Sequence, residues 1–461
     1  MTRAPGPTVR QALRTLRSED LLTALLALHQ EHGDVAGFRY GRKAWVAIRD
    51  PEHIEHVLVA RNDNYTKSYD YRLLAVVTGR GLLTNEGAAW AGQRRLIQPM
   101  FAGRHLSRFA GDMTAAAATA LDRWERTPDG SRIDVAEEMS VLTLDVVGRA
   151  LFGADLGAHA GRIAPAVTVG LRTAITFARV PFMWLVPQRL INLGAAILFR
   201  FPIPRLRRIH RSVTTLDDVA VSIIDSRIER DEEHDDLLGL LLAARDPDTG
   251  ERMSKRQIRD ELMTFLLAGH ETTANGLAWM WYLLSSHPEA RERMSAEADA
   301  VLGDRTPTAD DATRLPWTAA CFQEAMRLYP PAWILERDAI GPDEVGGFEI
   351  PRRATVVISP YVVHRNPAVW KDPDVFDPER FLPGAAAGRP RSAYLPFGAG
   401  RRMCVGAGFA MMEGTLLAAM IARRFTLDLV PGADVVPEPT ATLRPRDGLP
   451  MILRRRDAAA P

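Results

Sequence analysis

The stretch Phe397-Gly398-Ala399-Gly400-Arg401-Arg402-Met403-Cys404-Val405-Gly406 decides how the rest of the chain is interpreted. Its one cysteine lies between a glycine-rich loop and an apolar run over residues 409–421 that is typical of a helix. A helix beginning just after Cys404 directs its free N–H groups and positive dipole end at the sulfur, which favours the metal-binding thiolate. The three glycines let the backbone approach a flat, bulky group. The stretch therefore predicts a thiolate ligand for the metal of a planar cofactor.

Two other interpretations of this stretch compete with that one. A single free cysteine, taken alone, is more often a buried and inert thiol. A dinucleotide-binding loop is excluded, because Gly398-x-Gly400-x-x-Met403 lacks the third glycine and the βαβ context is missing.

Five residues carry a resemblance to a known family: Phe397, Gly400, Arg402, Cys404 and Gly406 match, position for position, the cysteine loop of the cytochrome P-450 family. The resemblance implies a mainly α fold with small β-sheets (α+β), a single triangular-prism-like domain. It places haem b (iron protoporphyrin IX) between a long central helix and the cysteine loop. Cys404 is then the axial ligand of the iron, and Phe397, Gly398 and Gly406 contact the haem.

Composition and charge narrow the class of protein. The chain has 461 residues, 46% hydrophobic and 25% charged, which is ordinary for a globular protein. A net charge of +1 does not indicate nucleic-acid binding. Two cysteines, Cys321 and Cys404, form no disulfide framework, so we expect a reducing cytoplasm. No apolar stretch has the length of a signal peptide or a membrane span, and heavy use of Ala and Arg points to a bacterial source.

We expect one domain over residues 1–461, because no long polar linker divides the chain. A β-rich lobe covers about 34–62 and 337–360, a helical core about 88–330, and the cysteine loop with its helix about 394–424. Periodicity predicts helices at 18–30, 51–60, 115–120, 134–152 and 317–329, a hairpin at 34–49, short strands at 332–335 and 337–360, and closing hairpins at 424–454. Residues 62–85 and 382–392 read as loops, and 227–236 as a solvated charge run. By resemblance, 156–212 forms a mobile lid; packing into the core is the open alternative.

The longest predicted helix runs over residues 254–287, begins with the capping box Ser254-x-x-Gln257 and ends before Pro288. Its middle reads Ala268-Gly269-His270-Glu271-Thr272-Thr273. Small residues there let a flat cofactor approach, Thr272 can divert helix hydrogen bonds and open a bulge, and an acid beside a hydroxyl can relay protons.

Two other interpretations of this hexapeptide are a helix kink and a zinc site. A kink with Glu271 in a structural ion pair is the favoured interpretation of the stretch in isolation. A zinc hydrolase is excluded because Ala274 stands where a second histidine is needed. The family resemblance covers the hexapeptide too, and implies that Glu271 and Thr272 are catalytic and that Ala268 and Gly269 contact the haem.

Further basic and aromatic residues match family positions. Trp90 and Arg94 are four apart and share one helix face, so they can meet an anionic group of a cofactor. Alone, such a pair is usually packing plus a solvated charge. The resemblance implies that Trp90, Arg94, Arg337 and Arg402 bind the haem propionates.

Glu324 and Arg327 are three apart on one predicted helix face and can form an ion pair. The resemblance implies that they form a buried structural clamp with Arg380, not a catalytic site. Trp333, Ile334 and Leu335 are expected to line the substrate pocket, with a plain core role as the alternative.

The expected function is a haem-thiolate monooxygenase that inserts one oxygen atom of O2 into a hydrophobic small molecule by hydroxylation or epoxidation. Terpenoid, fatty-acid and polyketide substrates of bacterial secondary metabolism stay open. Because only 57 residues follow Cys404, we expect a separate ferredoxin and ferredoxin reductase as electron source. The arginines that could steer an acidic donor are Arg94, Arg95, Arg104, Arg108 and Arg401.

The alternatives are a haem-thiolate isomerase or peroxygenase, against which the Glu271-Thr272 pair argues, and a non-catalytic haem sensor, for which no signalling domain is visible. A monomer is expected.

Overall fold

The computed structural model describes residues 2–8, 11, 20–40, 43–153, 190, 204–230, 236–246 and 249–456. The chain forms two compact units, and each takes segments that are distant in sequence. The first unit comprises Met1–Ser68, Ala320–Cys404 and Pro437–Arg444; the second comprises Tyr69–Ala319, Val405–Val436 and Pro445–Pro461. The lid expected over residues 156–212 lies almost entirely outside the described residues.

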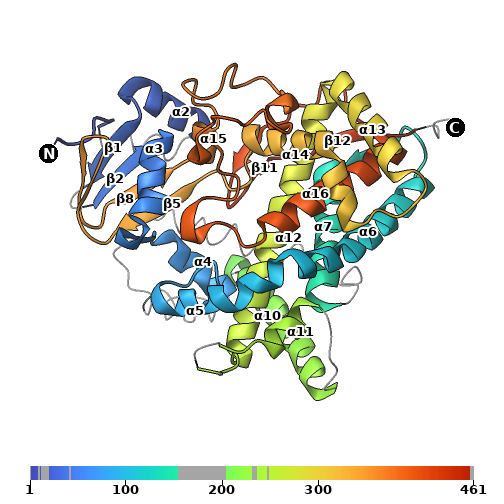
Figure 1. Ribbon diagram of the computed structural model, residues 1–461, viewed down its shortest axis with the longest axis horizontal. Helices are drawn as coiled ribbons and strands as arrows, with labels where there is room; N and C mark the ends of the chain where they lie inside the picture. Colours follow the sequence, from blue (N-terminus) through green and yellow to red (C-terminus); the bar gives the residue numbers. More distant parts are fainter. Residues whose placement is uncertain are drawn as a thin grey trace. The chain divides into compact units, whose positions relative to one another are not determined.

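A five-stranded sheet organises the first unit (Figure 1). Its order is β1 (Val35–Tyr40), β2 (Lys43–Ile48), β8 (Thr355–Ile358), β5 (Leu335–Ala339) and β3 (Tyr65–Lys67). Strands β2 and β8 are parallel and the other pairs antiparallel. The predicted hairpin is therefore confirmed as β1–β2. Two-stranded ladders add β6 (Asp343–Val345) with β7 (Phe348–Ile350), and β10 (Pro437–Pro439) with β11 (Leu443–Pro445).

The first unit also contains several helices and helical turns. Helix α3 (Pro51–Glu55) begins where predicted, because the Asp50 carboxylate accepts the N–H groups of Glu52 and His53. It continues into a π-helical turn, η1 (His56–Ala60). The remaining short elements are α2 (Leu21–His32), η2 (Asn62–Asn64), α15 (Pro360–Val363), η6 (Pro378–Phe381), η7 (Arg391–Ala393) and η8 (Gly400–Arg402).

Helices dominate the second unit. They are α4 (Asp70–Thr78), α5 (Gly87–Ile97), α6 (Gly103–Arg126), α7 (Val135–Phe152), α10 (Pro204–Arg230), α11 (Leu237–Ala243), α12 (Lys255–Ser285), α13 (Pro288–Leu302) and α16 (Ala407–Arg424), with the short turns η3 (Gln98–Phe101) and η5 (Ala309–Arg314). A sheet of β4 (Arg132–Asp134), β12 (Pro450–Arg455) and β9 (Phe425–Leu429) closes this unit. Helix α14 (Pro316–Leu328) contributes to both units.

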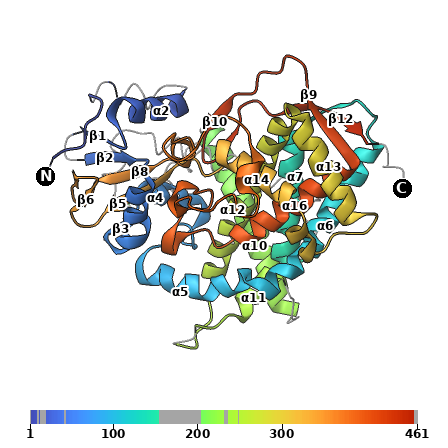
Figure 2. The ribbon, with the colours of Figure 1, turned by 45° about the horizontal axis from the view of Figure 1, so that its top comes forward.

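Helix α12 is the central element of the second unit. The predicted capping box is present: the Ser254 hydroxyl accepts the N–H of Gln257, and the Gln257 side chain accepts the N–H of Ser254. Most of its 31 residues are buried, and it packs along α7 and also against α16. Helix α16 in turn packs against α6 and α13 (Figure 2). A helix this long is therefore held by tertiary packing.

Several sequence expectations were wrong in detail. Residues 62–85 are not simply a loop, because they contain η2, β3 and α4. The charge run 227–236 is not simply solvated: Arg227 lies inside α10 and forms an ion pair of 2.8 Å with Asp236, and both side chains are nearly buried. No strand begins at Ala332, since β5 begins at Leu335. The expected bulge at Thr272 is absent, because α12 is continuous there.

Candidate functional site

The cysteine loop in the first unit is a tight, internally bonded turn. The N–H of Cys404 donates to the carbonyl of Phe397 at 2.9 Å, and the N–H of Gly398 donates to Leu395 at 3.1 Å. Gly398 and Gly400 both have φ of +69°, which glycine adopts without strain. A Cβ on Gly400 would lie 2.0 Å from the carbonyl oxygen of Leu58 in η1. Glycine at 400 is therefore required by both its conformation and its close backbone neighbour.

The two cysteines differ in exposure. Cys404 is exposed and Cys321 is fully buried, and neither is in a disulfide. Within the described ranges no group of three or more His, Cys, Asp or Glu side chains could hold a metal ion. An accessible thiol in a glycine-rich turn therefore fits a metal that brings its other ligands with it in a planar ring. The adjacent Arg401 and Arg402, exposed and partly exposed, suit a ring that carries anionic groups.

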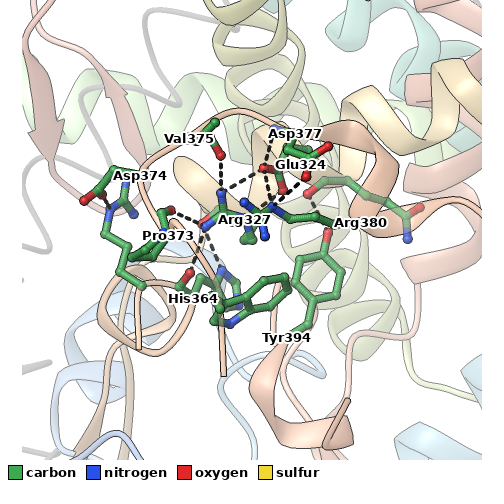
Figure 3. Close-up of polar contacts among 12 residues, drawn as sticks. Glu324, Arg327, His364, Pro373, Asp374, Val375, Asp377, Arg380 and Tyr394 are labelled. Atoms are coloured by element: carbon green, nitrogen blue, oxygen red, sulfur yellow. Dashed lines mark hydrogen bonds and ion pairs between the residues drawn. The ribbon is translucent and has the colours of Figure 1, made fainter. Parts of the chain in front are cut away.

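A buried arginine, Arg327, lies at the centre of a group of polar contacts in the first unit (Figure 3). Arg327 is 0% exposed and makes five hydrogen bonds, one for each of its N–H groups. Two go to the Glu324 carboxylate at 2.7 and 2.8 Å. The other three go to the backbone carbonyls of His364, Pro373 and Val375. One side chain thus ties α14 to the loop over residues 373–375.

Glu324 completes this cluster. It is also 0% exposed, and its Oε1 accepts the N–H of Asp377 at 2.9 Å. The Nε of Arg380 lies 3.5 Å from the same oxygen. The structure therefore brings Glu324, Arg327 and Arg380 together, as Figure 3 shows. Removing one partner would leave a buried charge uncompensated, at a cost of about 3–5 kcal/mol.

His364 is a connecting residue that the sequence reasoning missed. It is fully buried; its Nε2 accepts the N–H of Leu395 at 2.8 Å, and its Nδ1 therefore donates to the carbonyl of Arg327 at 3.1 Å. Burial, reinforced by the nearby Arg327 charge, lowers the pKa of His364 to about 3, so the ring is neutral. Leu395 leads directly into the cysteine loop. His364 thus joins the Glu324–Arg327 pair to that loop, and nothing in its spacing to Cys404 marks it in the sequence.

In the second unit, the middle of α12 departs from the burial of its flanks. Residues 261–267 and 273–281 are buried, whereas Ala268 is exposed and Gly269, Glu271 and Thr272 are partly exposed. The Thr272 hydroxyl donates to the Ala268 carbonyl at 2.6 Å, so its lone pairs stay available to accept. A small side chain at 268 beside a hydroxyl at 272 fits a flat group lying against the helix backbone.

Gly269 has a different reason to be glycine. A Cβ at this position would lie 3.2 Å from Cγ2 of Val147 on α7. Its missing side chain therefore permits the close packing of α7 on α12. The expected contact of Gly269 with the haem stays a prediction.

A second feature missed by the sequence reasoning is Glu413. It lies on α16 and is 0% exposed, neither of its carboxyl oxygens has a hydrogen-bond partner among the described residues, and burial raises its pKa to about 8. The acid is therefore neutral at pH 7. Its position as the only charged residue in the apolar run 409–421 was a signal that could have identified it.

The remaining predicted site residues divide between the units. Trp90 and Arg94 lie on α5 of the second unit, Trp90 buried and Arg94 bonded to Gln98 at 3.0 Å. Arg337 lies on β5 of the first unit and donates to the Glu336 carbonyl at 2.8 Å.

The three expected pocket residues differ from one another. Trp333 is a core residue, 5% exposed, and donates to the Thr440 carbonyl at 2.8 Å. Ile334 and Leu335 are partly exposed, and Leu335 Cδ1 is 3.9 Å from the Cβ position of Gly398.

Comparison with known proteins defines the class. The sequence profile named cytochrome P450 matches residues 3–451. A protein named as cytochrome P450 132 of Mycobacterium tuberculosis is 41% identical over 98% of both chains. The cyclooctat-9-en-7-ol 5-monooxygenase of Streptomyces melanosporofaciens is 33% identical, over 88% of this chain and 85% of its own. The crystal structure of a cytochrome P450DA heme domain superimposes with a TM-score of 0.87 at 27% identity, over 99% of each chain.

The chain belongs to the cytochrome P450 family and has its mainly helical fold. It is a cytochrome P450 monooxygenase, and the family implies a haem cofactor. Within the part of the chain that the structure describes, no helix is long and apolar enough to cross a membrane.

Proposed function

We propose that this enzyme uses haem b, bound through Cys404, to oxygenate a hydrophobic small molecule with electrons from a separate ferredoxin and reductase. The carrying observation is the accessible Cys404 thiol, held by its own N–H bond to Phe397 in a loop built on positive-φ glycines. When bound, the haem would supply an iron centre at which O2 is activated, and Cys404 would hold that iron as an electron-donating thiolate.

The protein's own residues have three roles in this proposal. Trp90, Arg94, Arg337 and Arg402 hold the propionates through charge-assisted hydrogen bonds. Five residues lie against the ring: Phe397, Gly398, Gly406, Ala268 and Gly269. Glu271 and Thr272 pass protons from solvent toward the reaction centre: the Thr272 hydroxyl, anchored to Ala268, accepts and donates at a fixed position.

A hydrophobic substrate is supported by the partly exposed Ile334 and Leu335, of which Leu335 lies beside Gly398 of the cysteine loop. The name of the Streptomyces relative specifies oxygenation of an alcohol, cyclooctat-9-en-7-ol. Terpenoids, fatty acids and polyketides are the classes to test, by hydroxylation or epoxidation. Screening a lipophilic library for a spin-state change of the haem identifies the binders.

We propose a cytoplasmic monomer, because the composition is that of an ordinary globular protein and neither cysteine is in a disulfide. Two measurements test the proposal. The reduced enzyme under carbon monoxide should show the spectrum of thiolate-ligated haem, which Cys404→Ser should abolish and the matched control Cys321→Ser should keep. Turnover should require NAD(P)H, ferredoxin and reductase. A spectrum of histidine-ligated haem contradicts the ligand, and turnover with peroxide alone favours a peroxygenase.

A further inference from the structure

One face of α7 makes three consecutive contacts with a single turn of α12. Ser140, Thr143 and Val147 are spaced three and four apart, so they share a helix face. The Ser140 Oγ lies 2.8 Å from Nε2 of His270. The Thr143 hydroxyl lies 3.1 Å from the His270 carbonyl oxygen and 2.9 Å from that of Met139 in its own helix, sharing one hydrogen between them. Val147 closes the contact against Gly269.

His270 is suited to hold this contact and not to carry protons. The side chain is 2% exposed and bonded only to Ser140 among the described residues, with no hydrogen-bond partner at Nδ1. Burial lowers the pKa of His270 to about 4, so the ring is neutral under working conditions. A neutral ring on one fixed hydroxyl is a spacer of set length between two helices.

The contact lies immediately before the proposed proton-delivery pair. Consecutive helical side chains are rotated by about 100°, so His270 faces α7 while Glu271 and Thr272 lie on the more exposed side. Because the backbone of one turn is rigid, fixing residue 270 against α7 fixes the direction of residues 271 and 272. A displacement of a catalytic group by about 1 Å is enough to lower the reaction rate strongly.

We propose that His270, with Ser140 and Thr143 of α7, is a positioning residue that aligns Glu271 and Thr272 for proton delivery. This proposal rests on the proposed function of the Glu271–Thr272 pair. None of the three residues needs to touch substrate or cofactor.

The variants remove the contact while keeping the packing. Ser140→Ala deletes the hydroxyl, and His270→Phe fills the space of the ring without its nitrogen. His270→Gln should restore function, because its amide can reach the position of Nε2. The matched control is Ser295→Ala: Ser295 is 5% exposed and its hydroxyl also crosses between helices, from α13 to the Ala422 carbonyl at 3.1 Å.

The first readout is hydrogen exchange of the purified holoenzyme. We expect amides over residues 268–274 to exchange about tenfold faster in Ser140→Ala and His270→Phe, the factor that corresponds to about 1.4 kcal/mol. The second readout is the fraction of NADPH electrons recovered as hydrogen peroxide, with ferredoxin, reductase and lauric acid as the lipophilic probe. We expect that fraction to rise at least about twofold, because misdirected proton delivery releases reduced oxygen. His270→Gln and Ser295→Ala should match the parent in both.

Each combination of results decides the matter. Faster exchange together with a larger peroxide fraction supports the proposal. Faster exchange with an unchanged peroxide fraction overturns it, since the contact then serves packing alone. A larger peroxide fraction without faster exchange, or no change in either, also overturns it. A parent enzyme that lacks the carbon monoxide spectrum of thiolate-ligated haem refutes the proposed function instead, and this is seen before any variant is made.

Discussion

At the scale of single residues, buried polar groups with few partners connect the site to its support. His364 is the clearest case, because one neutral ring accepts from Leu395 and donates to Arg327. A buried donor or acceptor left unsatisfied costs about 1–3 kcal/mol. Single substitutions at such positions are therefore expected to act on the cysteine loop without touching it.

We expect His364→Phe to lower the stability by about 2–5 kcal/mol, since it leaves the Leu395 N–H and the Arg327 carbonyl without the ring. The cysteine loop should lose its fixed position, so the reduced enzyme under carbon monoxide should lose the thiolate-type spectrum. The matched control is His29→Phe, which removes another buried ring, bonded to Gly33 at 2.9 Å. If both variants keep the parent spectrum, His364 does not hold the cysteine loop in position.

Glu413 predicts a pH dependence of stability. Burial raises its pKa in the folded state to about 8, above the value near 4.5 of an unperturbed glutamate. Between these values the unfolded chain releases the proton that the folded chain keeps. Stability should therefore fall with rising pH by about 1.4 kcal/mol per unit.

Glu413→Gln removes this term. Its unfolding midpoint should equal that of the parent near pH 4.5 and exceed it increasingly toward pH 8. The matched control is Glu137→Gln, which makes the same substitution at an exposed position. Parallel curves for Glu413→Gln and the parent would show that the acid is not held neutral.

At the scale of elements, the cysteine loop shows how two glycines with one backbone conformation differ in their surroundings. Gly398 and Gly400 share φ of +69°, and an L-residue there costs about 1–2 kcal/mol. A Cβ at 398 meets only Leu335 Cδ1 at 3.9 Å, whereas one at 400 meets the Leu58 carbonyl oxygen at 2.0 Å. Backbone cannot rotate away as a side chain can.

Gly400→Ala should therefore displace the loop from η1 and abolish the thiolate-type spectrum, and it should cost more stability than Gly398→Ala, whose conformational cost is about 1–2 kcal/mol. Carbon monoxide spectra and unfolding midpoints of the two variants make the comparison. Equal damage in both would mean that conformation alone, and not the contact with Leu58, requires glycine at 400.

At the scale of the whole molecule, local chemistry was predictable and long-range contacts were not. The capping box of α12, the cap at Asp50 and the β1–β2 hairpin follow from neighbouring residues, and the structure confirms them. The strand within residues 62–85 was missed because β3 pairs with β5, about 270 residues away, with Ser68 beside it bonded to Glu336. Likewise, His364 and the face of α7 formed by Ser140, Thr143 and Val147 act through partners that only folding brings close. No local sequence pattern predicts these contacts.

Electron supply is a property of the molecular surface, so its test belongs at this scale. Helix α6 carries exposed arginines near both ends, Arg108 and Arg126, about 27 Å apart along the helix. Only Arg108 belongs to the basic group that we propose steers an acidic ferredoxin. Arg108→Glu should slow reduction by ferredoxin at low ionic strength by about tenfold and flatten its salt dependence, because attraction between exposed charges is screened within about 10 Å at 0.1 M salt. Arg126→Glu makes the same change in net charge on the same helix and should leave the rate nearly unchanged. Stopped-flow measurement of the reduction rate across a salt series distinguishes the two variants. Equal slowing in both would mean that only the net charge matters, and it would contradict a defined docking face.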